Sequence, residues 1–134
     1  MSTKDLITAA IQARRAAYAP YSKFQVGAAL LTKSGKVFTG CNVENVSLGL
    51  TICAERAAVA AAVAGGEREF SAIAVVTEFP EPVWPCGACR QVLAEFNSGM
   101  DIIASTVGGR TDAMLLSDLL PQSGQRILGP PEDV

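Results

Sequence analysis

Two short cysteine-bearing segments constrain this chain more than any other feature of its sequence. The first is Cys53-Ala54-Glu55, which opens an alanine-rich run of strong helix formers. The second is PCGAC, residues 85–89, which opens another stretch with helical spacing. We therefore place both at helix N-termini, where free backbone N–H groups and the helix dipole lower a thiol's pKa. This setting favours metal ligation and redox chemistry equally.

The C-x-x-C segment alone leaves two interpretations open. With Trp84 just upstream and a glycine between the cysteines, it is typical of the redox dithiol of thioredoxin-like proteins, and it also fits half of a zinc clamp. A redox dithiol requires only its two cysteines, whereas C-x-E followed by P-C-x-x-C supplies three thiolates and a carboxylate. Zinc deaminases have that arrangement, usually with histidine as the first ligand. Because the chain has no histidine, only an all-cysteine variant is available.

The chemistry of such a site explains the residue types. Three protein ligands leave the fourth position of tetrahedral zinc to water, whose pKa zinc lowers from about 15.7 toward about 7. A carboxylate that is not a ligand, here Glu55, then moves protons. Three thiolates leave a net negative cluster, which a hydrogen bond from Arg56 or Arg90 to a sulfur would offset. The alternative for both arginines is a solvated helix surface.

Composition excludes several classes of protein. The 134 residues suit a single domain spanning 1–134, and a net charge of -2 without any basic run offers nucleic acid no electrostatic footprint. The longest wholly apolar run, Ala57 to Ala64, is far below the roughly 20 residues of a membrane span. Lys4 and Asp5 interrupt the N-terminus, so we expect no secretory signal and a cytoplasmic protein with free thiols.

Hydrophobic spacing and turn residues predict alternating helices and strands. Ser2 and Asp5 form a capping box for a first helix. The expected helices are 3–17, 53–64, 87–96 and 117–120, and the expected strands are 25–32, 36–43, 70–78 and 101–107, the first two forming a hairpin. This order predicts an α/β fold, with a mixed sheet covered on its faces by helices.

Four blocks of sequence resemble one known family. In order along the chain they are PYSKFQVGAAL, GCNVEN, GLTICAER and PCGACRQVLAEF, and the resemblance runs from about Pro20 to Leu120. The chain resembles the small, homotetrameric, zinc-dependent cytidine deaminases. The resemblance implies a three-layer α/β/α sandwich around a mixed five-stranded sheet, with one Zn²⁺ per chain. It also implies hydrolysis of cytidine or deoxycytidine to uridine or deoxyuridine plus ammonia, a reaction of pyrimidine salvage.

The resemblance assigns roles by matching position. It makes Glu55 the proton shuttle and makes three cysteines the zinc ligands: Cys53, Cys86 and Cys89. The fourth cysteine, Cys41, matches a buried family position. The alternative for Cys41 is a fourth ligand, which would close the zinc site and make the protein a structural zinc-binding module without turnover.

Substrate contacts follow from the same resemblance. Phe24 resembles the aromatic that packs on the pyrimidine, Asn42 and Glu44 resemble the pair that holds the ribose hydroxyl, and Ala54 lends a backbone contact to the base. The alternative interpretation, without the motif, is that Phe24 is a core aromatic and that Asn42 and Glu44 are surface residues of a loop.

Two departures from the family pattern bear on the substrate. Relatives often carry a tyrosine where this chain has Val46-Ser47-Leu48, and a phenylalanine after the C-terminal Leu-Leu-Pro where this chain's tail has none. A deaminase of a cytosine-bearing nucleoside antibiotic, of the blasticidin kind, is therefore the alternative function. The predicted helix over 53–64 is apolar around most of its circumference, which favours cover by neighbouring subunits and fits a homotetramer.

Overall fold

The computed structural model describes residues 1–124 and 127–129, which form five strands, four α-helices and one short 3₁₀ helix. In chain order these elements are α1 (Thr3–Arg14), β1 (Gly27–Thr32), β2 (Val37–Cys41), η1 (Leu48–Leu50), α2 (Ala54–Ala64), β3 (Phe70–Thr77), α3 (Gly87–Phe96), β4 (Asp101–Thr106), β5 (Thr111–Leu115) and α4 (Leu116–Leu119). In the described part of the chain, no helix is long and apolar enough to cross a membrane.

The strands form one mixed sheet in the order β2-β1-β3-β4-β5. Only the β3–β4 pair is parallel, with α3 making the crossover between them, and the other neighbours are antiparallel. The central strands β3 and β4 are almost entirely buried, as continuous apolar strands covered on both faces must be.

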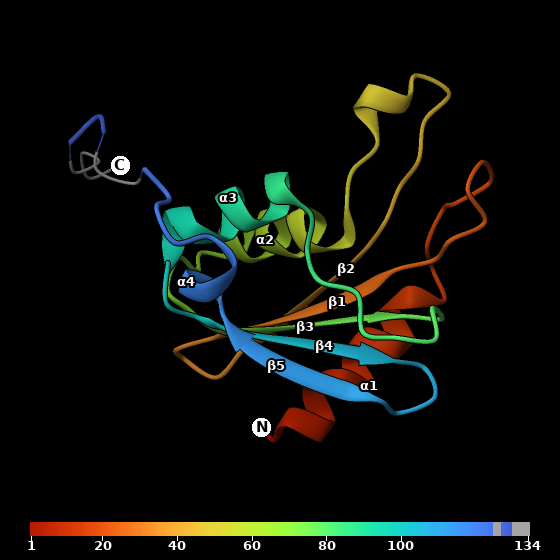
Figure 1. Cartoon of the computed structure of the whole chain (residues 1–134), viewed down its shortest axis with the longest axis horizontal. Coiled ribbons are helices and arrows are strands. Elements are labelled where there is room, and N and C mark those ends of the chain that lie inside the picture. Colours follow the sequence, from red (N-terminus) through yellow and green to blue (C-terminus); the bar gives the residue numbers. More distant parts are fainter. Residues whose placement is uncertain (125–126, 130–134) are drawn as a thin grey trace.

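Helices cover both faces of this sheet and give three layers, as the resemblance implied. Figure 1 shows α1 below the sheet and α2, α3 and α4 above it. One buried cluster lies between the sheet and the upper helices and includes Leu30, Phe70 and Leu93. A second cluster lies between the sheet and α1 and includes Leu6 and Ala10.

Two glycines allow helices to approach the hairpin closely. A Cβ atom on Gly40 of β2 would lie 2.4 Å from the carbonyl oxygen of Ala54, and one on Gly27 of β1 would lie 2.0 Å from that of Ala10. Real Cβ atoms essentially never come so close, so any side chain at either position would push a helix away. Gly40 thus sets the depth at which the first turn of α2 lies against the sheet.

The predicted elements match the structure except in a few places. The capping box of Ser2 and Asp5 is present, but α1 ends at Arg14 rather than near Ala17. The hairpin, α2, α3, β3, β4 and α4 lie within three residues of their expected positions. No spacing pattern predicts β5, although the resemblance implies a fifth strand. The tail that lacks the family's aromatic includes residues 125–126 and 130–134, which lie outside the described residues.

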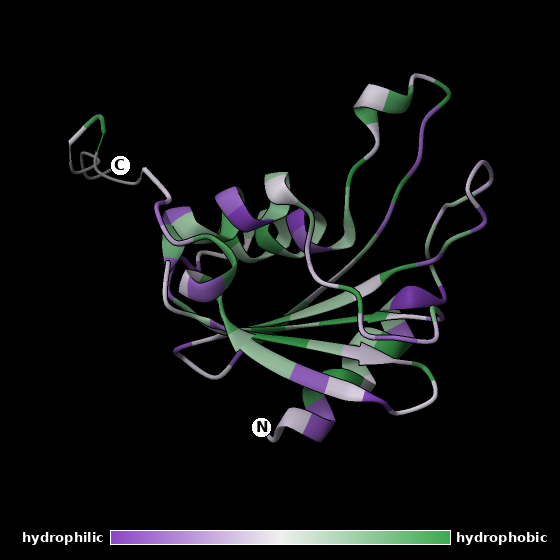
Figure 2. Ribbon diagram, in the orientation of Figure 1, coloured by the Kyte–Doolittle hydropathy of each residue, from purple (hydrophilic) through white to green (hydrophobic). Residues whose placement is uncertain are grey.

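A long loop, residues 42–53, leaves the body between β2 and α2 (Figure 1) and carries η1 near its tip. Its hydrophobic side chains are exposed: Val46 by 79%, Leu48 by 71% and Leu50 by 66%. Figure 2 shows green, hydrophobic segments on this projecting loop. Apolar side chains gathered on a projection of a small chain indicate a contact surface rather than part of its own core.

Candidate metal centre and active site

Three of the four cysteines converge at one end of the upper layer. The Sγ atoms of Cys53, Cys86 and Cys89 all lie within 4.8 Å of one another. Cys53 Sγ lies 4.0 Å from Cys86 Sγ, which in turn lies 3.5 Å from Cys89 Sγ. Zinc–sulfur bonds of about 2.3 Å at tetrahedral angles would place two sulfurs about 3.8 Å apart. The three thiols, none of them in a disulfide, therefore have the spacing that zinc requires.

The convergence results from two helix starts that meet. Cys53 is the N-cap of α2 and Cys86 is the N-cap of α3, while Cys89 lies in the first turn of α3. Neither of these two thiols forms a capping hydrogen bond with its own helix. Pro85 precedes Cys86, whose backbone is extended, as residues entering a helix require.

Arg56 supplies the charge that the thiolates need. Its guanidinium donates a hydrogen bond to Cys53 Sγ at 3.3 Å and another to the carbonyl oxygen of Thr51 at 3.4 Å. The hydrogen bond from Cys89, and then that from Arg56, lower the pKa of the Cys53 thiol to about 5. The same contact with Cys53 raises the pKa of Cys89. Of this pair, the pKa shifts favour the thiolate form at Cys53 over Cys89.

Arg90, the second arginine considered, has a different role. It donates from Nε to the carbonyl oxygen of Pro85 at 2.7 Å and from Nη1 to that of Leu119 at 3.1 Å. Of the two arginines considered, Arg56 is therefore the one that bonds a sulfur, while Arg90 bonds backbone carbonyls. Its side chain instead ties the loop before Cys86 to α4, because its guanidinium is engaged by two backbone carbonyls.

Glu55 lies next to the sulfurs in the first turn of α2. Its side chain is only 5% exposed, and burial raises the pKa of this carboxyl to about 7. A carboxyl with such a pKa both accepts and releases a proton near neutral pH, as a proton carrier must.

A pocket of about 260 Å³ opens beside Glu55 and the sulfurs. Seven of the expected site residues are in the wall of this pocket: Phe24, Asn42, Glu44, Cys53, Ala54, Glu55 and Cys86. Cys89 is fully buried and is not in the wall. Its wall also contains residues that the sequence reasoning missed: Ser22, Val26, Thr51, Val75, Val83 and Trp84. Trp84 had a signal in its place directly before the P-C-x-x-C motif, whereas the others become neighbours only through the fold.

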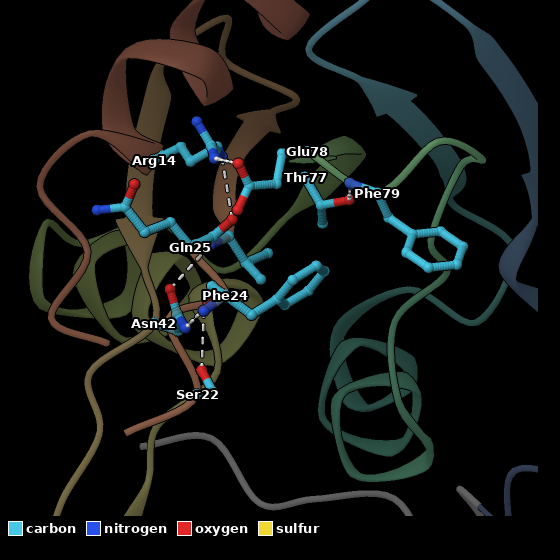
Figure 3. Close-up of polar contacts among 9 residues, drawn as sticks. Arg14, Ser22, Phe24, Gln25, Asn42, Thr77, Glu78 and Phe79 are labelled. Carbon is cyan, nitrogen blue, oxygen red and sulfur yellow. Dashed lines mark hydrogen bonds and ion pairs between the residues drawn. The ribbon is translucent and has the colours of Figure 1, made fainter. Parts of the chain in front are cut away.

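The two residues expected to hold the sugar are engaged in the chain's own structure. Asn42 donates from Nδ2 to the carbonyl oxygen of Phe24 at 2.7 Å and accepts from the backbone N–H of Val26 at 2.9 Å, as Figure 3 shows. Glu44 accepts hydrogen bonds from Ser22, which lower the pKa of the Glu44 carboxyl, and from the N–H of Tyr21. Both side chains thus fix the rim of the pocket on which Phe24 lies.

Two further residues lie apart from this site. Cys41, at the end of β2, is half-buried rather than buried and is not a member of the sulfur cluster. A fourth thiol ligand from Cys41, which would close a structural zinc site, is therefore not formed. Leu48 lies on the projecting loop and is not in the pocket wall of the single chain.

Known proteins share both the sequence and the zinc-binding pattern of this chain. Residues 1–105 match the family model for the cytidine and deoxycytidylate deaminase zinc-binding region. The chain belongs to the cytidine deaminase family. It is 51% identical over 122 residues to the cytidine deaminase of Halalkalibacterium halodurans, covering 90% of this chain and 92% of that protein. It is 48% identical over 114 residues to that of Mycobacterium tuberculosis, covering 85% and 83%.

Solved structures of the family have the same fold. The crystal structure of cytidine deaminase from Burkholderia pseudomallei superposes with a TM-score of 0.88 at 52% identity, covering 90% of this chain and 98% of that one. The Mycobacterium tuberculosis enzyme superposes with a TM-score of 0.78 at 45% identity, covering 90% and 95%. The zinc-binding region and the three-cysteine cluster together give one zinc ion per chain.

Zinc content distinguishes the clustered cysteines from the fourth. We expect Cys53→Ala to lose zinc, because its thiol is one of the three that converge on the metal position, whereas Cys41→Ala, outside the cluster, keeps about one zinc per chain. Metal analysis of the purified variants measures the difference. Equal loss of zinc from the two variants would contradict the ligand set.

Proposed function

We propose that this protein hydrolyses cytidine and deoxycytidine to uridine and deoxyuridine with release of ammonia, in pyrimidine salvage. One observation carries the proposal: three thiols with the spacing of a zinc site adjoin a buried carboxyl in the wall of a pocket. A thioredoxin-like dithiol would use neither Cys53 nor Glu55. A structural zinc site would have no use for an adjacent pocket.

Cys53, Cys86 and Cys89 hold the metal, and Arg56 offsets part of their charge through Cys53. Zinc bound there supplies a Lewis acid that lowers the pKa of a water toward about 7. Glu55 is placed to accept a proton from the attacking water as the oxygen of the water adds to C4 of the pyrimidine, and to pass that proton to N3. It then carries the second proton of the water to the amino group, which leaves as ammonia while C4 becomes a carbonyl.

The rest of the pocket positions a nucleoside. Phe24 packs on the pyrimidine face, and the backbone of Ala54 contacts the base. Asn42 and Glu44 face the sugar. The amide nitrogen of Asn42 has two hydrogens and uses one within the chain, so one remains for the substrate. The carboxylate of Glu44 has about four lone-pair sites and accepts three hydrogen bonds within the chain, so one site remains. Recognition of the sugar by polar groups favours nucleosides over free bases.

The proposed working form is a homotetramer in the cytoplasm. The outward side of α2 carries exposed Ala60, Ala61, Val63 and Ala64, and the projecting loop adds its own apolar residues. Free thiols suit a reducing compartment. Sedimentation should give four chains per particle, and a stable active monomer would contradict the assembly.

Replacing the proton carrier should remove turnover without removing the site. We expect Glu55→Gln to keep its zinc and its melting temperature but to lose at least about 10²-fold in kcat, the usual share of general acid–base catalysis. Glu81→Gln, at an exposed loop position, is the matched control and should keep full activity. The role is refuted if the Glu55→Gln variant retains more than a tenth of the wild-type kcat.

The substrate range follows from the sugar contacts and from the altered loop. We expect turnover of cytidine, deoxycytidine and a 5-substituted cytidine, and hardly any of cytosine or a single-stranded oligonucleotide. The missing aromatics should weaken cytidine binding relative to relatives that keep them. Ammonia release across this panel, with blasticidin S included, measures the preference. Efficient turnover of cytosine would overturn sugar recognition, and turnover of blasticidin S alone would establish the alternative function.

A further inference from the structure

The segment from Phe24 to Val26, which carries Phe24 into the pocket, is held mainly by side chains, and the carbonyl of Val26 also accepts from the backbone N–H of Asn42 at 3.3 Å. Phe24 to Val26 precede the first residue of β1. Four of their backbone groups bond to side chains: the N–H of Phe24 to Ser22, the carbonyl of Phe24 to Asn42, the carbonyl of Gln25 to Arg14, and the N–H of Val26 to Asn42. Without these partners the segment would lack most of its fixed contacts.

The turn before the segment raises the need for such contacts. Lys23 has a φ of 61°, in the left-handed region that is unfavourable for a residue with a Cβ. Such a conformation persists only where the surrounding structure determines it. Ser22 and Asn42 hold Phe24 from the pocket side, and both are themselves in the pocket wall.

Arg14 holds the segment from the opposite side. It lies in the last turn of α1, outside the pocket wall, and donates from Nε to the carbonyl oxygen of Gln25 at 3.0 Å. Its Nη2 lies 3.2 Å from a carboxylate oxygen of Glu78, which follows β3, as Figure 3 shows. The arginine side chain is only 13% exposed, whereas that of Glu78 is 54% exposed.

Close packing of α1 makes this reach possible. A Cβ on Gly27 would lie 2.6 Å from the backbone nitrogen of Arg14, so the glycine lets the end of α1 lie directly against the start of β1. The planar guanidinium then bonds the carbonyl and the carboxylate through different nitrogens at once, which a lysine ammonium does less well.

We propose that Arg14 is a positioning residue for substrate binding, acting through the carbonyl of Gln25 to hold Phe24 against the base. Arg14 itself is in neither the pocket wall nor the sulfur cluster. The inference rests on the proposed function only for the role of Phe24. Loss of Arg14 should therefore weaken nucleoside binding while leaving zinc and proton transfer intact.

The experiment pairs Arg14→Met with two controls. Arg15→Met removes the same charge from the next residue, which is exposed, and Glu78→Gln removes the ion pair but leaves the bond to Gln25. We expect Arg14→Met to raise the KM for cytidine about 5- to 10-fold, as the loss of one ordinary intramolecular hydrogen bond would, with little change in kcat or zinc content. The KM of Arg15→Met should match that of the wild type, and the KM of Glu78→Gln should lie between those of the wild type and Arg14→Met.

A double substitution separates positioning from general destabilisation. If Arg14 acts through Phe24, then Arg14→Met added to Phe24→Ala should change the KM less than about 2-fold, because coupled residues are not additive. An equal further rise in the Phe24→Ala background would overturn the proposal, as would an unchanged KM in Arg14→Met alone.

Amide hydrogen exchange gives a readout that does not depend on turnover. Arg14→Met should speed exchange at the amides of Phe24 and Val26 while leaving β3 and β4 protected, and Arg15→Met should not. Uniformly faster exchange, or no local change, would overturn the positioning role. Failure of the wild type to deaminate any nucleoside would refute the proposed function, and exchange would still decide whether Arg14 holds the segment.

Discussion

The arrangement of this site depends on two helices that begin at the same place. Cys53 and Cys86 are the N-caps of α2 and α3, so three thiols gather where the positive ends of two helix dipoles point. Gly40 fixes the depth of α2 against the sheet, and the β3–α3–β4 crossover fixes α3. The position of the metal centre is thus set by packing of the upper layer.

Charge balance explains why the site needs more than three sulfurs. Three thiolates around one Zn²⁺ leave a net negative charge, and the carboxyl of Glu55 is buried beside them. One arginine, Arg56, bonds the cluster directly, and the helix N-termini add partial positive charge. The pKa of Glu55 is raised because burial outweighs this help, which leaves the carboxyl able to exchange protons near neutral pH. The same burial that is costly for folding is therefore useful for proton transfer.

Sequence patterns predicted what is local and missed what arises only in the folded chain. The capping box, the hairpin and the buried strand β3 each have a signal within a few residues, and the cysteine spacing identified the sulfur cluster. Strand β5 was missed because all five of its residues are exposed at the sheet edge, so burial imposes no alternation on them. Gly109, with a φ of 98°, lies in the tight turn between β4 and β5. In the sequence this glycine is equally compatible with the end of a strand. Val75 and Val83 entered the pocket wall without any local signal.

The pocket wall that contains Phe24 and the projecting loop differ in how firmly the chain's own contacts hold them. Phe24 is held through its backbone from both sides of the segment, which keeps the base-facing wall rigid at little cost in ordering when a ligand binds. The loop after β2, in contrast, carries its apolar side chains away from its own pocket and into solvent. In the proposed function, this fixed wall is the part of the pocket that contacts the base and the sugar. If the chain assembles as proposed, a neighbouring subunit would cover that loop, and the size of substrate that the pocket accepts would then depend on the assembly.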